Sequence, residues 1–442
     1  GTIEKQGAKI RQLEIRGPEI QMAQPSQTQG EVTPVPMSDY EFNQRLDAAT
    51  GGAQKWLKDL KFSGDLRLRY EAFANHGTFS DPDRNRFRFR LRYGFEKGFG
   101  DQMKVGFSLA SGEKVTNNGH NADPTSTNQT MGNLEDFKNI WIEKAYATYK
   151  PNWAEIGPIS GLELTGGKFT NPFEKGSSDL IFDRDLKPEG AYETAKFKLL
   201  DTEDFDLESY FTAGQFILQE GSTVGTDAEM YGFQLGISPT VYVPWMDRPL
   251  NFFGAVSYYD YSDYEKSRSW RIDQNAIGQS LANGNSVCSA TNLCTSYKVA
   301  DYYGEVTLTP YAGIPITPFI DVAQNFDEKQ SSFDRHAWTV GTKLGKQLKK
   351  GDWQFLYQYK WLGADATPGA FTDSDFGYRG YNGNKGNIFK LGYLLTDNLS
   401  LNAAAFYVRN LNIGGMLDAT APTTLIKSEE QQRYQLDLVW KF

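Results

Sequence analysis

Stretches of alternating apolar and polar residues run from residue 61 to residue 442, and the connections between them alternate in length. Successive side chains of a β-strand point to opposite faces, so each stretch predicts a strand with one apolar and one polar face. The sixteen predicted strands are 61–72, 84–96, 102–113, 139–150, 160–170, 190–200, 205–219, 228–239, 249–260, 298–309, 317–327, 334–346, 352–364, 386–396, 398–410 and 430–442.

The connections after even-numbered strands are mostly short, whereas those after odd-numbered strands are mostly long. The long ones are 114–138, 171–189, 261–297, 365–385 and 411–429. Two odd connections, 220–227 and 328–333, are shorter and weaken the rule without reversing it. A soluble β-sandwich has no reason to keep this rhythm. An all-β, transmembrane antiparallel β-barrel has one, because short periplasmic turns close one rim and long extracellular loops close the other.

Composition agrees with a membrane barrel. Aromatic residues make up 14% of the chain and Gly occurs 43 times, yet the mean hydropathy is only −0.55. No window is apolar enough for a transmembrane helix, but a barrel shows its apolar side chains on only half of each short strand. The net charge of −9 argues against a nucleic-acid partner.

The last predicted strand has a regular alternation that ends on an aromatic residue. Its polar face carries Arg433, Gln435, Asp437 and Lys441. The pattern resembles the insertion signal of Gram-negative outer-membrane barrels, and it favours such a barrel over the final strand of a soluble sandwich. The residues of this predicted signal are Tyr434, Leu436, Leu438, Trp440 and Phe442.

The chain is predicted to have three parts. Residues 1–37 are rich in Gln, Glu, Pro and Thr and predict a flexible periplasmic arm, with a periplasmic partner as one possible role. Residues 38–60 begin with a capping-box pattern and predict a short helical lead-in, with a loosely ordered lead-in as the alternative. Residues 61–442 form the predicted barrel. Cys288 and Cys294 are six residues apart in a polar stretch and predict a loop disulfide formed in an oxidising compartment.

Arginines at a spacing of two are the most specific local pattern. Their common face cannot be the lipid face, where each would cost about 2–4 kcal/mol near the midplane. One interpretation is a basic ladder along a water-filled pore that guides anions. The other is a set of lumenal arginines neutralised by wall carboxylates such as Asp65 and Glu71, or by an inserted loop. The ladder consists of Arg67, Arg69, Arg84, Arg86, Arg88, Arg90 and Arg92.

The connection 171–189 combines a high charge density with the apolar residues Leu180, Ile181 and Phe182. An apolar patch in a charged loop predicts that the loop folds back against another surface, although an outward loop with its own small core is an alternative. The charged residues predicted for a constriction are Glu174, Lys175, Asp179, Asp183, Arg184 and Asp185. Their carboxylates would then face the arginines across a gap.

These features together resemble the bacterial "putative porin" family, a relative of the general and phosphate-selective porins. The resemblance covers roughly 61–442 and rests on the hairpin arginines, the stretches 167–173 and 183–190, and Phe442. It implies a bacterial outer-membrane location beside lipid and lipopolysaccharide, a third loop folded into the lumen, passive diffusion of small hydrophilic solutes, and often a homotrimer. No dedicated phosphate-binding Lys cluster matches, so the resemblance does not extend to phosphate selectivity.

Nothing in the pattern predicts an enzyme, a cofactor or a metal site. His76, His120 and His336 are scattered, and no Ser and His pairing for nucleophilic catalysis is evident. Four functions follow from the sequence, with a diffusion porin preferred. The others are a solute-specific, anion-preferring channel, a non-transporting barrel that serves as anchor or adhesin, and a soluble β-rich binding protein.

Overall fold

The computed structural model describes most of the chain after residue 58. The described residues are 59–76, 82–114, 122–132, 134–220, 227–243, 248–266, 284–286, 293, 295–310, 313–327, 335–377, 382–411, 417–418, 421–425 and 430–442. The predicted arm, almost all of the predicted lead-in, and both cysteines of the predicted disulfide lie outside these residues.

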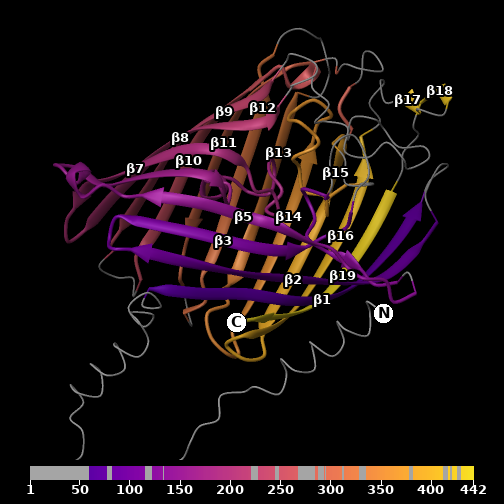
Figure 1. The fold of residues 1–442 in the computed structure, drawn as a ribbon, viewed down its shortest axis with the longest axis horizontal. Helices are drawn as coiled ribbons and strands as arrows, with labels where there is room; N and C mark the ends of the chain where they lie inside the picture. The colour runs from indigo at the N-terminus through magenta and orange to yellow at the C-terminus, as the bar shows by residue number, and fades with distance from the viewer. Residues whose placement is uncertain are drawn as a thin grey trace, which may run out of the picture. The chain divides into compact units, whose positions relative to one another are not determined.

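Residues 59–442 form one compact unit built around a closed antiparallel β-barrel (Figure 1). Its sheet has seventeen strands, of which the two-residue strand β4 (Gln129–Thr130) lies beside β2 and the other sixteen close the barrel. The barrel strands are β1 (Leu60–His76), β2 (Arg84–Phe99), β3 (Met103–Ser111), β5 (Ile140–Tyr149), β6 (Ile159–Lys168), β7 (Glu189–Asp201), β8 (Phe205–Gln219), β9 (Ala228–Val241), β10 (Leu250–Ser262), β11 (Tyr297–Thr307), β12 (Ile316–Asn325), β13 (His336–Gly345), β14 (Trp353–Leu362), β15 (Asn384–Leu394), β16 (Leu399–Asn410) and β19 (Glu430–Lys441).

The predicted fold is confirmed: each predicted strand overlaps one strand of the barrel. Three short 3-10 turns, η1 (Asn152–Ala154), η2 (Glu174–Gly176) and η3 (Tyr264–Lys266), and a separate hairpin of β17 (Leu417–Asp418) and β18 (Ala421–Leu425) complete the described elements. In the described part of the chain no helix has the length and apolar character needed to cross a membrane.

The connections keep the predicted rhythm. One rim has short turns such as 100–102, 202–204 and 395–398. The opposite rim has long loops, and three of these recur below: the second loop (112–139), the third loop (169–188) and the seventh loop (363–383). The short rim corresponds to the periplasmic side of membrane barrels of this kind.

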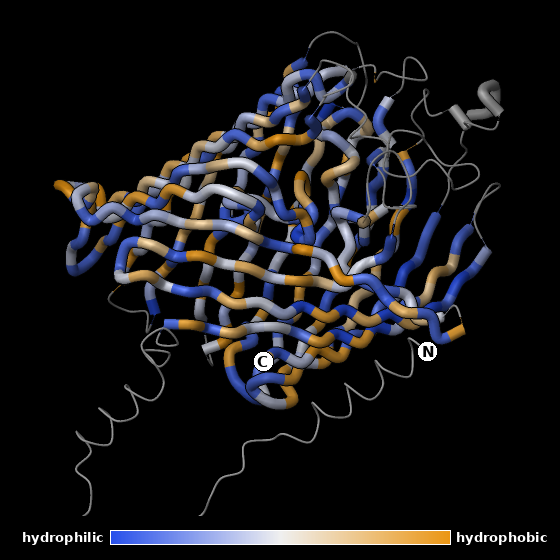
Figure 2. The backbone as a smooth tube through the Cα atoms, viewed as in Figure 1, coloured by the Kyte–Doolittle hydropathy of each residue, from blue (hydrophilic) through white to orange (hydrophobic). Residues whose placement is uncertain are grey.

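The two faces of the wall differ as the alternation requires, and Figure 2 shows hydrophobic and hydrophilic positions interleaved along the strands. On β1, Leu66, Leu68 and Tyr70 are exposed on the outer face, whereas Arg69 and Glu71 are buried on the lumen side. Exposed aromatic residues gather near both ends of the outer face, as expected for interfacial girdles. They include Phe62, Tyr93, Phe99, Trp353, Tyr393 and Trp440 toward the short-turn rim, and Tyr70, Phe87, Tyr231, Tyr258, Tyr302, Trp338 and Tyr407 toward the loop rim.

The third loop folds against the inner wall. Phe173 is completely buried, with its ring centroid 5.7 Å from that of Phe216 and 5.2 Å from that of Tyr259. Beyond it, the backbone N–H of Ser178 donates to Asp321 of β12 at 2.7 Å, and Lys360 of β14 donates to the carbonyl of Asp179 at 2.7 Å. Burial of Phe173 therefore holds the start of the loop against β8 and β10, and the hydrogen bonds with Asp321 and Lys360 carry it on to β12 and β14.

The terminal strand closes the barrel. β19 pairs with β1 on one side and with β16 on the other. Phe442 and Gly64 exchange backbone hydrogen bonds of 2.9 and 3.1 Å. A Cβ atom on Gly64 would lie 2.6 Å from the Phe442 ring, so only glycine lets the ring lie against β1. The predicted signal residues lie on the outer face of this seam, where Tyr434, Leu436, Leu438, Trp440 and Phe442 are exposed.

Candidate pore site

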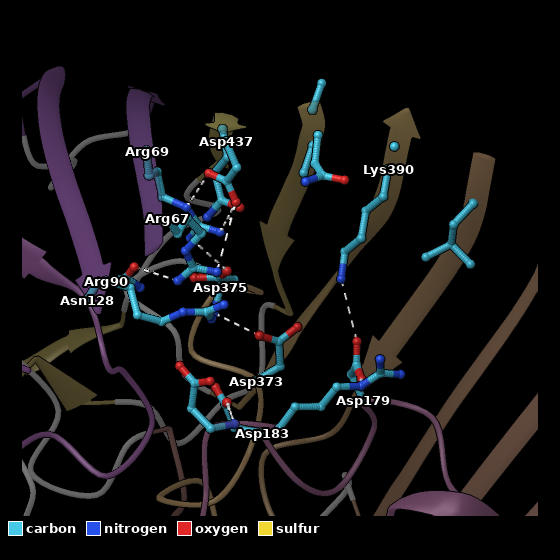
Figure 3. Close-up of a pocket in the computed structure, with 18 of the residues that line it drawn as sticks. Arg67, Arg69, Arg90, Asn128, Asp179, Asp183, Asp373, Asp375, Lys390 and Asp437 are labelled. Carbon is cyan, nitrogen blue, oxygen red and sulfur yellow. Dashed lines mark hydrogen bonds and ion pairs between the residues drawn. The ribbon is translucent and has the colours of Figure 1, made fainter. Parts of the chain in front are cut away.

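A cavity of about 510 Å³ lies inside the barrel between the arginine-bearing wall and the inserted loops. Figure 3 shows Arg67, Arg69 and Arg90 on one side of it, and Lys390 with Asp179 on the other. Its lining reaches the short-turn ends of β13 to β16 through Lys343, Gln347, Gln354 and Asn402. The charged residues of its lining are Arg67, Arg69, Arg90, Arg92, Asp179, Asp183, Arg184, Asp185, Lys343, Asp373, Asp375, Lys390 and Asp437.

The register of β1 and β2 places the arginines directly opposite one another. Arg67 pairs with Arg90, and Arg69 pairs with Arg88. Like charges directly opposite each other on a sheet are destabilising, so this hairpin requires anions close by. Carboxylates from the wall and from two loops supply them.

Glu71 is the shared counter-charge of the arginines that lie nearest the loops on β1, β2 and β19. It is completely buried and forms ion pairs with Arg86 and with Arg433 of β19, while Arg88 lies 3.9 Å away. The Arg433 guanidinium also reaches Asp375 at 2.6 Å. Close ion pairs and further hydrogen bonds are needed to offset the desolvation of a buried carboxylate, and the seam between β1, β2 and β19 provides three cations for Glu71.

The middle of the wall is paired as well. Arg69 makes a bidentate contact to Asp437, with both N–O distances 2.7 Å. Arg90 contacts Asp65 at 2.7 Å. Arg92 lies between Glu143, at 2.9 Å, and Asp185 of the third loop, at 2.6 Å. Fork-shaped guanidinium groups suit such paired geometry.

Two arginines are less fully paired. Arg67 donates to the Asn128 side chain at 2.5 Å, but its nearest ion-pair partner, Asp437, is 3.9 Å away. Its Nε atom has no hydrogen-bond partner within the described residues. Arg84, at the start of β2, is exposed and forms no ion pair with any described side chain. Arg67 is therefore the ladder residue whose charge is least compensated inside the cavity.

The third-loop carboxylates divide between two sides of the cavity. Asp185 contacts Arg92 directly, whereas Asp179 pairs with Arg184 at 2.6 Å and with Lys390 at 3.5 Å. Burial opposes ionisation of Asp179 and Asp185, yet nearby cations hold the pKa of each below its usual value. Burial and the neighbouring Asp373 carboxyl instead raise the pKa of Asp183. The expectation that these carboxylates face the arginines across a gap therefore does not describe Asp185.

Glu174 and Lys175 do not line the cavity. Lys175 lies over the Tyr210 ring, 4.7 Å from its centroid, and also faces Phe253. Both residues belong to the short turn η2, which faces the β8 to β10 wall. Within the described residues no cluster of three or more His, Cys, Asp or Glu side chains is suited to hold a metal ion.

The seventh loop supplies site residues that the sequence reasoning missed. Asp375 contacts Arg69 and Arg433, and Asp183 accepts from the backbone N–H of Ser374 at 2.9 Å. The sequence did contain a signal that the seventh loop folds inward. Phe371 and Phe376 flank these polar residues, just as apolar residues interrupt the third loop. Asn128 and Ser126 of the second loop were missed too, and their polar segment gives no comparable signal.

A closed barrel with an apolar outer belt and a charged lumenal cavity defines the chain as an outer-membrane channel. The family comparison agrees: the model of the family described as "Putative porin" matches residues 74–290 and 304–415. The chain belongs to this family. It is a porin-type protein of the bacterial outer membrane and not an enzyme.

Solved structures resemble the chain at low identity. OprB of Pseudomonas putida, in its high-pH structure, is 12% identical, with a TM-score of 0.48 over 90% of this chain and 97% of that one. OmpF of Salmonella typhi, in complex with daunomycin, is 9% identical, with a TM-score of 0.46 over 87% and 97%. OccK11 of Pseudomonas aeruginosa is 11% identical, with a TM-score of 0.41 over 88% and 97%. No curated protein matches the chain.

Proposed function

We propose that the protein lets small hydrophilic solutes and ions diffuse passively through a water-filled pore, which the third and seventh loops narrow and the arginine wall makes anion-preferring. The observation that supports this proposal most strongly is the charged cavity between that wall and the two loops. Both loops are tied to the wall by ion pairs, which supports a fixed constriction rather than a loose cover.

Anion preference follows from incomplete compensation of the cations. Arg67 has no close carboxylate. Lys343 and Lys390 also face the cavity, but Lys343 is paired with Glu305 at 2.9 Å and Lys390 lies 3.5 Å from Asp179.

On the acidic side, burial raises the pKa of both Asp183 and Asp373. Neighbouring carboxyls cannot both ionise cheaply, so the acidic side carries less negative charge than its residue count suggests. Most of the other ladder arginines serve the neutralised, structural role that was the alternative interpretation.

Planar-bilayer recording tests this proposal. The purified protein should give stepwise conductance, with a reversal potential of the anion-selective sign under a salt gradient. Arg67→Gln should shift that potential toward cation selectivity, because it removes the least compensated cation of the cavity. Lys349→Gln, an exposed residue of the 346–352 turn, is the matched control and should leave the potential unchanged. Equal potentials for the protein and Arg67→Gln would contradict a selective role for the ladder.

Convergent donors in the cavity also favour a second candidate, a channel specific for one class of anionic solute. Arg67, Asn128 and Lys390 reach the cavity from different elements. Saturable block of conductance by one anion class would select this function. Conductance that no solute blocks in a saturable way would support simple diffusion.

We also infer a homotrimer, in line with the expectation from the family. Gly166, Ala191 and Ala213 are neighbours across β6, β7 and β8 on the outer face, and Glu193 lies among them. Lipid contact is unfavourable for this carboxylate, although it costs less than the roughly 2–4 kcal/mol of a lipid-facing Arg or Lys near the midplane, so coverage by a neighbouring subunit is favoured. Light scattering in detergent should give three chains per particle, and Glu193→Arg should lower that number. A particle of one chain would contradict the trimer.

A further inference from the structure

The β15 groove, a hollow of about 250 Å³, lies on the outer face of the barrel at the loop ends of β14, β15, β16 and β19. Asn387 of β15 pairs with Tyr359 on one side and with Tyr407 on the other. A short side chain between two tyrosines leaves the surface hollow at this point. The residues that line the groove are Tyr359, Lys385, Gly386, Asn387, Tyr407, Val408, Arg409, Glu430, Gln431 and Gln432.

Two cations lie side by side at the loop end of the β15 groove. Lys385 and Arg409 pair directly across β15 and β16 and face outward. Among the described residues only Arg409 of the two has an ion-pair partner, the Glu430 carboxylate of β19. That pair is solvent-accessible, and pairs of this kind contribute little to stability. Because like charges directly opposite each other on a sheet repel, the two cations favour an added anion.

Other outward lysines near the loop ends are balanced by their neighbours across the sheet. Lys168 of β6 pairs with Glu189 of β7, and Lys298 of β11 pairs with Asp260 of β10. Lys385 faces a second cation instead. An anionic head group in the surrounding lipid should therefore bind at β15 and β16 in preference to these other positions.

The β15 groove lies away from the surface proposed for subunit contact. β15 is eight strands from β7 in either direction around the sixteen-stranded barrel (Figure 1). The small residues and the carboxylate that favour subunit contact lie on the outer face of β6, β7 and β8. The groove therefore stays in contact with lipid whether the particle is one chain or a trimer.

The two cations lie at the height of the lipid head groups. Tyr407 belongs to the aromatic girdle toward the loop rim, and Lys385 lies one step further out, level with Trp338 and Trp361. Aromatic rings of such girdles mark the head-group level of a membrane. On the loop side of the outer membrane the leaflet consists largely of lipopolysaccharide, whose lipid A part is a phosphorylated, acylated sugar.

Polar and apolar surfaces follow one another along the groove. Tyr357 donates to the side-chain oxygen of Asn387 at 3.0 Å, and Tyr434 donates to that of Gln432 at 2.8 Å, so the amide N–H groups of both remain for sugar hydroxyls. Toward the midplane the outer face becomes apolar, with the pairs Phe389–Ala405 and Leu391–Ala403. This order matches phosphate, sugar and acyl chain.

We propose that the β15 groove binds the phosphorylated sugar head group of lipid A, with one phosphate between Lys385 and Arg409 and an acyl chain along β15 and β16. The guanidinium fork of Arg409 suits bidentate contact with a phosphate, and Lys385 adds a compact charge. This binding requires only the outer-membrane location and is independent of whether the pore conducts.

Native mass spectrometry of the full chain in a non-ionic detergent tests the proposal. Delipidated protein is titrated with hexa-acylated diphosphoryl lipid A and, in separate arms, with dephosphorylated lipid A and with phosphatidylglycerol. We expect one diphosphoryl lipid A per chain, bound more tightly than either of the others. Equal binding of the dephosphorylated form would overturn the role of the phosphate, and equal binding of phosphatidylglycerol would overturn the choice of a glycolipid. Absence of binding would overturn the site.

Variants then locate the site. Lys385→Gln combined with Arg409→Gln should weaken binding of diphosphoryl lipid A about tenfold, the change that about 1.4 kcal/mol produces. Asn387→Trp fills the groove without changing the charge and should weaken binding as well. Lys298→Gln combined with Lys349→Gln removes two exposed cations elsewhere and should leave the affinity unchanged. Resistance to unfolding in cold SDS shows that each barrel has folded. Unchanged affinity in the first two variants, or an equal loss in the control, would overturn the proposal.

Discussion

The two sides of the lumen are built from the same kind of strand but are filled in opposite ways. Toward β8 to β12, inward side chains such as Phe216 and Tyr259 pack against Phe173 and Phe182 of the third loop and form a continuous apolar core. Toward β1, β2 and β19, the inward side chains are arginines and carboxylates around an open cavity. One barrel thus encloses an apolar core, like that of a soluble protein, on one side and a charged pore on the other.

The comparison shows that the inner face of a barrel can be either apolar or charged, according to what packs against it. Where a loop brings apolar side chains, the wall beside it becomes apolar, because burial then stabilises both. Where the wall carries charge, the loops that reach it must bring counter-charge, as Asp185 and Asp375 do. Substitutions on the charged side should therefore act through unpaired charges, and substitutions on the apolar side should act through altered packing.

The largest effect is expected on the charged side, for Glu71→Gln. This change leaves Arg86, Arg88 and Arg433 buried without their shared anion, and loss of one partner of a buried ion pair costs about 3–5 kcal/mol. The free energy of unfolding in urea, measured from lipid or detergent, checks it. Glu189→Gln instead removes the solvent-accessible ion pair between Glu189 and Lys168 and should cost about 0–1 kcal/mol. Equal losses for the two variants would mean that burial of Glu71 does not matter.

Phe173→Ala tests the apolar side. Deleting this buried ring should cost about 3 kcal/mol, at the lower end of the range for Phe→Ala, since water can enter the space from the lumen. Because the ring anchors the third loop, single-channel conductance should also rise. Phe87→Ala removes an exposed ring from the outer face of β2 and should leave conductance unchanged. Unchanged conductance with Phe173→Ala would show that this loop does not narrow the pore.

Gly232→Ala tests the packing of the apolar side by adding one methyl group. The added Cβ would lie 2.6 Å from the Phe173 ring, and overpacking of this kind costs about 1–3 kcal/mol. Gly254→Ala is the control, because its nearest neighbours would be 3.8 Å away. The unfolding free energies of the two variants should differ, and identical values would argue against tight packing beneath the loop.

Acidification should act on the charged side through Asp183. Burial raises its pKa, so as the pH falls from neutral this carboxyl takes up a proton before a carboxyl with the usual value of about 3.9 does. Because its pKa is higher in the folded than in the unfolded state, the folded state binds this proton more tightly, and a fall in pH through the raised pKa stabilises the fold through this group. The cavity then becomes more positive, and the reversal potential should shift slightly toward anions. In Asp183→Asn that part of the shift should already be present at neutral pH.

Arg84→Gln should have the smallest effect. Arg84 is exposed at the start of β2, and surface substitutions of this kind usually change the free energy of unfolding by less than about 0.5 kcal/mol. A loss as large as that of Glu71→Gln would show that the whole ladder acts as one ionic network, including its exposed end.

Much of this architecture was predictable from the sequence. The alternation of Leu66, Arg67, Leu68 and Arg69 already assigns one face of β1 to lipid and the other to the lumen, because a one-residue slip would put arginine into lipid. The apolar residues Leu180 to Phe182 correctly indicated a loop folded against another surface. The same reasoning applied to Phe371 and Phe376 would have found the seventh loop.

The sequence alone therefore determined the strands, their faces and the closed barrel, since these depend on local periodicity and on the cost of polar groups in lipid. The tertiary structure decided which charges meet. Glu71 and Arg433 are far apart along the chain and become partners only through closure of β1 onto β19. The approach of Asp375 to Arg69 likewise depends on how loops fill the lumen, and no local pattern encodes that.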